Sequence, residues 1–277
     1  LIQQDALDED RSQLPIDTPD DLWALASELE IATDDGGTLK LEIQDAAAKI
    51  DVNAARIVSD NEANRDAVLN WLRDFFAKVI EEMPGRKEEK PWDPDELARN
   101  LMDYLDEDEV ALRGEPEDAW YQAQDPPYRA WNKPLLSLDD LALVKGFDRT
   151  LVAALRPYVT VYPFEGTGVN PNTAPSWVAA ALHIGGGLDK RLASEDDVQQ
   201  LLKARTELPI CDVSQAQQEC GDWPPADVTT IPPSDVYRSD VFQVTATASY
   251  GDVRRSVEAV VDRKKPAEPV LYGWRVR

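Results

Sequence analysis

Carboxylates are the side chains that this sequence concentrates strongly enough to suggest chemistry. Between Asp103 and Asp118 the chain carries eight acidic residues and a single arginine. The acidic residues are Asp103, Asp106, Glu107, Asp108, Glu109, Glu115, Glu117 and Asp118. Because like charges at this density repel one another, the segment favours either a solvated loop or a loop that binds a cation. The spacing alone leaves both interpretations open.

Three of these carboxylates follow the count of an EF-hand calcium loop. Asp106, Asp108 and Glu117 occupy its positions 1, 3 and 12. Positions 5 and 6 are Val110 and Ala111, so the standard EF-hand turn is not encoded. A cation site here therefore needs a different loop geometry. The ion would be a hard cation on oxygen ligands, because one histidine and two cysteines exclude a zinc site of the usual ligand count.

Other catalytic patterns in the sequence are less specific. Two carboxylates could serve as the acid and nucleophile of a glycoside hydrolase, but 53 acidic residues make some matching pair inevitable. A calcium-stabilised glycoside hydrolase is thus the enzymatic alternative. The one histidine, His183, follows Trp177, Val178 and Leu182 on a helical stripe, which favours a packed or surface residue over a Ser-His-Asp triad. Residues 185–187 are glycines without the lysine and hydroxyl residue of a phosphate loop.

The charge balance argues against nucleic acid and anionic membranes as partners. The chain has 29 basic and 53 acidic residues, a net charge of −24 and an isoelectric point near 4.3. Phosphate binding depends on clustered lysine and arginine. Val169–Ala174 resembles half of a helix-hairpin-helix DNA module, but its acidic surroundings favour a helical packing unit. No apolar run approaches the roughly 20 residues that a membrane-spanning helix needs.

The cysteines and the first residues bear on the compartment. Cys211 and Cys220 bound a ten-residue segment. A disulfide there would contribute about 2.7 kcal/mol to stability, and two free thiols are the alternative. The disulfide interpretation favours an oxidising compartment. Because the chain begins at Leu1 without a signal-like start, we interpret it as a processed or truncated ectodomain.

The elements that must position these residues change type twice along the chain. Alternation of apolar and polar residues predicts strands over 38–44 and 49–53. Helical stripes then predominate, and one of them runs from Val68 to Ile80. Helix starts are expected at Ser59, which has capping-box spacing, and at Asp93, which a proline follows. Further helix starts are expected at Ser137, at Asp148, at Asn172 or Thr173, and at Ser194. Alternation returns after residue 240 and predicts an antiparallel meander with one solvated face.

The resulting fold class is α+β, with a small sheet built from both chain ends. We expect a discontinuous α/β core of residues 1–58 and 206–277. Residues 59–205 would form a helical domain inserted between its two parts.

Several short blocks resemble, in the same order, the motifs of the type II secretion system minor pseudopilin K family. Asp45–Asn53 resembles its "D-x-x-G-[KR]-I-N-[LV]-N" strand, and Met102–Asp108 is similar to "hydrophobic-x-D-W-[IL]-D-x-D". Gly114–Tyr121 looks like "G-A-E-D-x-Y-Y". Further similar blocks are Pro127–Leu135, Leu138–Asp148, Val169–Ala174 and Ser239–Val244. They span nearly the whole chain, and their order makes them specific as a set.

The resemblance implies a pilin-like fold, with an N-terminal helix and an antiparallel sheet that carry a large helical insertion. It implies a non-enzymatic subunit at the tip of the type II secretion pseudopilus. Such a subunit would bind the I and J minor pseudopilins and initiate or cap the pseudopilus for protein export across the outer membrane. Its location would be the periplasmic face of the bacterial inner membrane, held by an N-terminal helix that this chain lacks.

The resemblance also implies a calcium site in the helical insertion. Asp106, Asp108, Glu117 and Asp118 resemble the acidic motif of the family, and Asn132 resembles its downstream asparagine. These five residues are the expected metal ligands.

Two blocks depart from the family pattern. Ala48 and Asp51 stand where the first block usually has glycine and asparagine, and Glu115-Pro116 replaces a smaller residue within the acidic motif. The second departure could move a ligand of the expected calcium site.

Overall fold

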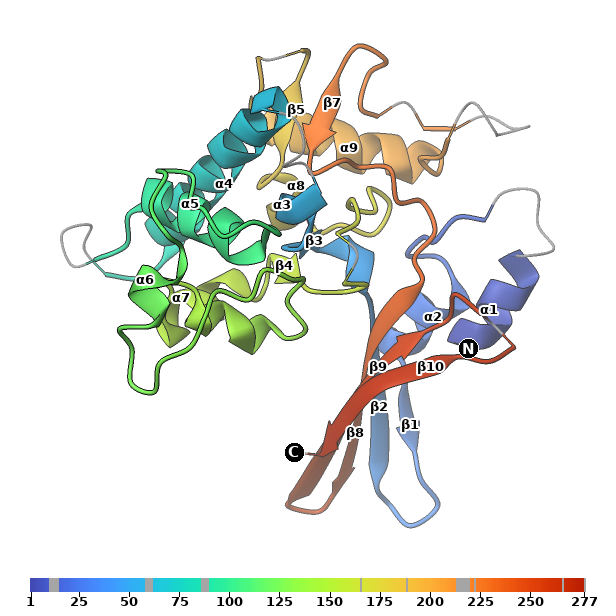
Figure 1. Cartoon of the computed structure of the whole chain (residues 1–277). Helices are drawn as coiled ribbons and strands as arrows, with labels where there is room; N and C mark the ends of the chain where they lie inside the picture. Colours follow the sequence, from blue (N-terminus) through green and yellow to red (C-terminus); the bar gives the residue numbers. More distant parts are fainter. Residues whose placement is uncertain are drawn as a thin grey trace.

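The computed structural model of the chain combines one five-stranded antiparallel sheet with a larger, mainly helical block (Figure 1). It describes residues 1–9, 15–57, 62–85, 90–164, 166–187, 189–212, 220–221, 223–265 and 267–276. The strands of the sheet lie in the order β1 (Glu30–Ala32), β2 (Thr38–Asp45), β8 (Val241–Tyr250), β9 (Val253–Asp262) and β10 (Val270–Val276). The predicted α+β class is confirmed.

The sheet joins the two ends of the chain. β2 pairs with β8 from Thr38 opposite Ser249 to Asp45 opposite Phe242. β8, β9 and β10 follow as the predicted meander. The alternating apolar residues of β8 and β9 fall on one face, and a register shift between Leu271 and Gly273 interrupts the alternation in β10. On that face Ile43 and Phe242 are buried. The predicted strand pattern at both ends of the chain is therefore confirmed.

Short N-terminal helices cover one end of the apolar face. These are α1 (Ile2–Glu9), α2 (Leu22–Leu25) and the 3-10 turn η1 (Ala26–Glu28). The Trp23 ring lies edge-on to Phe242, with 5.0 Å between ring centroids. Arg263 is fully buried, and its guanidinium nitrogens lie 2.7 Å from the carboxylates of Asp5 and Asp17. This buried pairing links the N-terminal segment to the end of β9.

The helical block forms the main core of the molecule. Its helices are α3 (Ala54–Ile57), α4 (Glu62–Glu82), α5 (Pro94–Leu105), α6 (Asp118–Tyr121), α7 (Arg149–Leu155), α8 (Ser176–Ala179) and α9 (Glu195–Glu207), with 3-10 segments η2 (Ala46–Ala48) and η5 (Leu138–Leu143). Its short strands are β3 (Ile50–Asp51), β4 (Val159–Thr160), β5 (His183–Gly185), β6 (Arg191–Leu192) and β7 (Thr229–Ile231).

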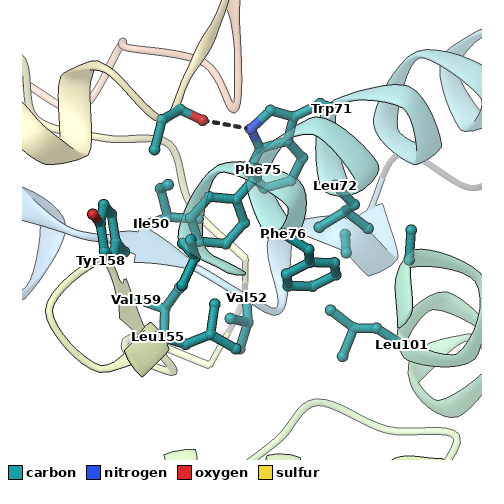
Figure 2. Close-up of a cluster of buried hydrophobic side chains, with 14 of the residues drawn as sticks. Ile50, Val52, Trp71, Leu72, Phe75, Phe76, Leu101, Leu155, Tyr158 and Val159 are labelled. Atoms are coloured by element: carbon teal, nitrogen blue, oxygen red, sulfur yellow. Dashed lines mark hydrogen bonds between the residues drawn. The ribbon is translucent and has the colours of Figure 1, made fainter. Parts of the chain in front are cut away.

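Helix α4 is the centre of this core. Its predicted apolar stripe is buried along its whole length: Val68, Trp71, Leu72, Phe75, Phe76, Val79 and Ile80. Figure 2 shows Phe75 and Phe76 facing residues from β3, α5, α7 and β4. The Trp71 indole nitrogen donates a hydrogen bond of 3.0 Å to the carbonyl of Ala181. A periodicity read from sequence thus identified the face that packs.

Predicted helix starts agree with the structure where a capping side chain is present. Asp93 accepts from the amide of Asp95 at 2.9 Å, and Asp148 accepts from Leu151 at 2.8 Å. Ser194 closes a capping box with Asp197. Ser137 also closes a capping box, but the element that follows is the 3-10 segment η5. The predicted capping box at Ser59 lies outside the described residues.

Two local predictions are wrong. His183 begins strand β5 and does not continue a helix, because α8 ends at Ala179 and the chain then pairs with β6 and β7. The expected helix start at Asn172 or Thr173 is also absent, since α8 starts at Ser176 after Pro175. In both places tertiary pairing overrides a short apolar pattern.

The predicted strand over 49–53 is short. Only Ile50 and Asp51 pair, in parallel with Val159 and Thr160. The division of the chain into domains stays a prediction, and hydrophobic packing groups Ile50 with the helical block. Among the described residues, no helix is long and apolar enough to cross a membrane.

Candidate functional site

The first and last parts of the acidic segment lie close together at the C-terminal end of helix α5. Asp103 lies in the last turn of α5, and Asp106 caps the helix, with its amide donating to the carbonyl of Met102 at 3.0 Å. The apolar face of α5 is anchored in the core through buried residues such as Leu101 and Leu105. Asp103 and Asp106 are three positions apart, so both carboxylates lie on one side of the helix.

A tight hairpin returns the chain to this helix end. Val110 pairs with Pro116 in an antiparallel bridge, and the amide of Ala111 donates to the carbonyl of Glu115 at 2.9 Å. Gly114 has φ +83°, a conformation that favours glycine. The hairpin brings Glu117 back against α5, where its side chain is buried.

Three carboxylates converge there. One carboxylate oxygen each of Asp103, Asp106 and Glu117 lies within 4.8 Å of the others. Asn132 joins them from a separate loop: its amide nitrogen donates to Glu117 Oε2 at 3.4 Å and also to the backbone carbonyl of Asp108. The backbone of Asn132 is held by a bond of 3.0 Å to the carbonyl of Tyr104.

The cluster contains oxygens that have no partner among the described residues. These are Asp106 Oδ1, Glu117 Oε1 and Asn132 Oδ1, and all three are buried. Buried polar atoms in native proteins are nearly always satisfied. An oxygen-rich group with free lone pairs and excess negative charge matches the ligand preference of a hard cation such as calcium. The residues present therefore fit such an ion.

The pKa shifts in the cluster also indicate a site for a cation. Burial, followed by the neighbouring carboxylates, raises the pKa of Asp106 to about 7 and that of Glu117 to about 8. Burial also raises the pKa of Asp103. Without a cation, the folded protein thus holds these groups together against their mutual repulsion. A bound divalent cation would reverse this effect and favour the ionised forms.

The structure separates the five predicted ligands into two groups. Asp106, Glu117 and Asn132 come together at the cluster. The side chain of Asp108 accepts from its own loop, at the amide of Val110, 2.7 Å away. Asp118 accepts from the amide of Ala130 at 3.0 Å and faces Arg129. A ligand role for Asp108 and Asp118 stays a prediction.

Asp103 belongs to the cluster, although we did not include it among the predicted ligands. The sequence did indicate Asp103, because it precedes Asp106 by about one helical turn and therefore lies on the same side of the helix. Aromatic rings pack next to this turn: the centroids of Tyr104 and Tyr121 are 5.4 Å apart, and Tyr128 lies 5.4 Å from Tyr121. They give the end of α5 a rigid support.

Other blocks that resemble the family motifs form buried polar contacts between distant parts of the chain. Buried Asp45 accepts from Asn170 Nδ2 at 3.0 Å and from Thr173 Oγ1 at 2.5 Å. Asn53 exchanges two hydrogen bonds with the backbone of Leu135, at 2.7 and 3.2 Å. The 169–174 segment is buried at Asn170, so it does not present a phosphate-binding turn to solvent.

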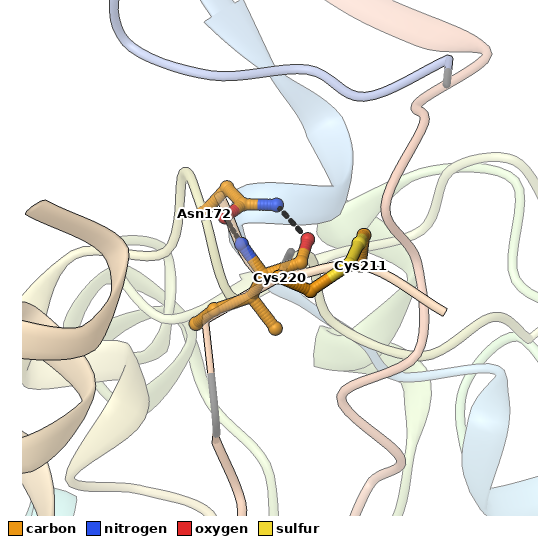
Figure 3. The surroundings of a disulfide bond; sticks show 4 residues. Asn172, Cys211 and Cys220 are labelled. Carbon is orange, nitrogen blue, oxygen red and sulfur yellow. Dashed lines mark hydrogen bonds between the residues drawn. A yellow bond between two sulfur atoms is a disulfide. The ribbon is translucent and has the colours of Figure 1, made fainter. Parts of the chain in front are cut away.

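The disulfide lies beside the buried 169–174 segment. Cys211 and Cys220 are bonded, with Cα atoms 5.6 Å apart. Asn172 exchanges two hydrogen bonds of 2.8 Å with the backbone of Ile210, next to Cys211 (Figure 3). Residues 213–219, within the loop that the disulfide closes, lie outside the described part of the chain.

His183 packs inside the helical block. Its Nε2 lies 3.0 Å from Asp74 Oδ2 of α4, and the imidazole is 2 % exposed. Burial is the largest effect and lowers the pKa of His183, while the Asp74 carboxylate acts in the opposite direction. The pair links strand β5 to α4.

Comparison with known proteins gives a consistent result. A family model described as "Type II secretion system (T2SS), protein K" matches residues 48–164. The type II secretion system protein K of Aeromonas hydrophila is 27 % identical over 241 residues, which cover 86 % of this chain and 70 % of that protein. The Klebsiella pneumoniae protein K is 30 % identical over 182 residues, covering 66 % of this chain and 52 % of that protein. The chain is similar to type II secretion system protein K over most of its length.

The fold agrees with this family. The GspK–GspI–GspJ complex of enterotoxigenic Escherichia coli contains a chain that superposes with a TM-score of 0.62 at 19 % identity. The match covers 95 % of this chain and 87 % of that chain. The putative protein K of Escherichia coli K12 is 29 % identical over 171 residues, and this chain spans 48 % of its length. The predicted resemblance to the K family is therefore confirmed.

Proposed function

We propose that this chain is a non-enzymatic minor pseudopilin at the tip of a type II secretion pseudopilus. It assembles with the I and J minor pseudopilins to initiate or cap the pseudopilus for protein export across the outer membrane. The observation that carries this proposal is the match of 95 % of the chain to a subunit fold solved together with GspI and GspJ.

The shape of the molecule supports a capping position. The helical block lies at one end of the sheet, and the hairpin that joins β8 to β9 points away from it (Figure 1). A subunit with this bulk at one end leaves little room for another subunit stacked above it. Pilin-like sheets can therefore stack on one side of this chain only.

The same proposal places the chain at the periplasmic face of the bacterial inner membrane. A disulfide between Cys211 and Cys220 supports a compartment in which thiols are oxidised. The strongly acidic composition gives no electrostatic basis for binding nucleic acid.

We also propose that calcium binds at the end of α5. Asp103, Asp106, Glu117 and Asn132 would hold it, and three of these residues each have a buried oxygen without a partner among the described residues. The ion would supply positive charge where three carboxylates converge. It would tie the 107–117 hairpin and the loop of Asn132 to one helix end.

Co-elution with the I and J pseudopilin ectodomains of the same organism tests the tip assignment. In size exclusion with calcium present, we expect one shared peak in which the three chains have equal molar amounts. A peak that excludes this chain over a range of micromolar concentrations would contradict the assignment.

A further inference from the structure

The edge of the five-stranded sheet at β10 carries unused hydrogen-bonding capacity. β10 is the last strand in the sheet order, and no strand among the described residues pairs with its outer side. All seven of its residues are exposed. An edge of this length is a template for another strand, because it presents a row of backbone N–H and C=O groups.

The side chains of β10 give this edge little protection. Leu271, Trp274 and Val276 are 52, 66 and 58 % exposed. Natural edge strands usually avoid pairing through lysine, proline or a strong bulge. β10 contains no proline, and its one charged residue, Arg275, lies 2.5 Å from Glu258 of its own sheet.

A bulge shapes only the first part of the strand. The register with β9 shifts between Leu271 and Gly273. Tyr272, between them, packs against the helical block, with its ring centroid 6.1 Å from Tyr162 and 5.2 Å from Phe164. This contact holds the strand in place while residues 273–276 continue in regular pairing with β9.

The opposite edge of the sheet is a poorer template. β1 consists of only Glu30, Ile31 and Ala32. Three residues offer few backbone groups, and the acidic side chain of Glu30 stands on this edge. β10 is therefore the edge suited to a partner.

The charge around β10 indicates the chemistry of that partner. Apart from the buried Arg263, residues 253–276 carry five basic and three acidic residues, in a chain whose net charge is −24. Arg255 stands exposed on the apolar face of β9, two positions from Val257. An acidic segment is favoured here. A second copy is disfavoured, because it would bring an identical basic hairpin and the same large negative net charge.

We propose that β10 binds an extended, acidic segment of a neighbouring pseudopilus subunit as an additional strand of the sheet. Backbone hydrogen bonds supply the affinity, and Trp274 and Val276 pack against alternate apolar side chains of that segment. The inference rests on the proposed function and names the surface by which the chain would join its neighbours.

A charge substitution at the edge tests this inference. Trp274→Glu should weaken binding to the mixed I and J ectodomains at least tenfold, because the new carboxylate repels an acidic strand. The matched control is Ile31→Glu, an exposed residue on the same sheet face at the other edge, which should bind as wild type does. Circular dichroism melts establish that both variants fold.

Hydrogen exchange on the wild-type assembly gives an independent readout. The amides of β10 should exchange at least tenfold more slowly in the assembly than in the isolated chain. Equal binding by Trp274→Glu, or unchanged exchange of β10 in an assembly that forms, would overturn the strand inference and leave the proposed function standing. Light scattering that shows dimers of the wild type, lost in Trp274→Glu, would overturn it in favour of a second copy.

Discussion

At the scale of single residues, the acidic segment combines two kinds of carboxylate. Asp108 and Asp118 stabilise loops through backbone amides. Asp103, Asp106 and Glu117 converge with unpartnered buried oxygens. The second kind is the group that already converges as a cation site, and a ligand role for Asp108 and Asp118 stays a prediction.

The calcium proposal makes a prediction about stability at this scale. Calcium should raise the free energy of unfolding by about 2.7 kcal/mol when its concentration is a hundred times the dissociation constant. Asp106→Ala should abolish this increase, because it removes a ligand from the centre of the cluster. Glu109→Ala, an exposed acidic residue of the same loop, is the control and should keep it. Thermal melts in calcium and in EDTA measure the difference.

The same melts can contradict the proposed calcium site. Wild-type melts that coincide in calcium and in EDTA would show that the cluster binds no calcium at these concentrations. Terbium luminescence excited through nearby tyrosines offers a readout that does not depend on stability, and it too should be lost in Asp106→Ala.

Asp51 gives a pH prediction at the same scale. It is 1 % exposed, and burial raises its pKa to about 7, although it accepts hydrogen bonds from the amides of Asn53, Gly166 and Thr167. Between the unfolded pKa of 3.8 and this value, the folded state binds more protons than the unfolded state. The contribution of Asp51 to stability therefore falls as pH rises through this window and stays constant above it.

Asp51→Asn should remove this contribution to the pH dependence. The slope of the unfolding free energy between pH 4 and 7 should become shallower, by a total of up to about 4 kcal/mol across the window. Any hydrogen bond lost to the new amide group lowers stability equally at every pH, so the slope still isolates the titration. Urea unfolding at several pH values checks this, and identical slopes in both proteins would refute it.

At the scale of elements, one buried arginine connects the N-terminal segment to the sheet. Arg263 donates from one guanidinium nitrogen to both oxygens of Asp17 at 2.7 Å, and its Nε donates to the carbonyl of Ser239 at 2.9 Å. Both Arg263 and Asp17 are fully buried. Removal of one partner would leave an uncompensated charge in the interior.

Arg263→Leu should therefore destabilise the protein by about 3–5 kcal/mol. The double variant with Asp17→Asn should lose less than the single variant, because the orphaned carboxylate is gone while its acceptor oxygen remains. Arg275→Leu removes an exposed pair with Glu258 and should cost at most about 1 kcal/mol. Guanidinium chloride unfolding measures all three, and equal losses for the single and double variants would count against a buried charge pair.

At the scale of the whole molecule, the net charge of −24 opposes compactness. The acidic residues are spread over the N-terminal segment and the helical block, while residues 253–276 carry more basic than acidic residues. No single ion pair compensates this excess of negative charge. The stability of the folded state should therefore depend on how strongly salt screens the repulsion among all the carboxylates.

Sodium chloride should therefore stabilise the calcium-free protein. Between 10 mM and 0.1 M the Debye length falls from about 30 to about 10 Å, which weakens repulsion between surface carboxylates. We expect the melting temperature to rise by several degrees over this range in EDTA. A melting temperature that is constant or falls with salt would show that local ion pairs outweigh the net repulsion.

Local patterns allowed much of the fold to be predicted. The strand faces of β2 and β8 follow from alternation, and the caps at Asp93 and Asp148 follow from side chains that bond amides two or three residues away. The predictions that failed, at Asn172 and His183, concern residues whose partners are distant in sequence. Asn172 bonds the backbone of Ile210, and His183 pairs with strand β7.

The sequence by itself thus determined the element types, the faces they bury, the family and the acidic segment, because each depends on neighbours within a few residues or on an ordered set of short motifs. Only the tertiary structure decided which carboxylates meet. A hairpin brings Asp106 and Glu117 together, and Asn132 joins them from another loop. Arg263 pairs with Asp17, which lies 246 positions away in the sequence. Such contacts are set by the packing of whole elements, which no local periodicity records.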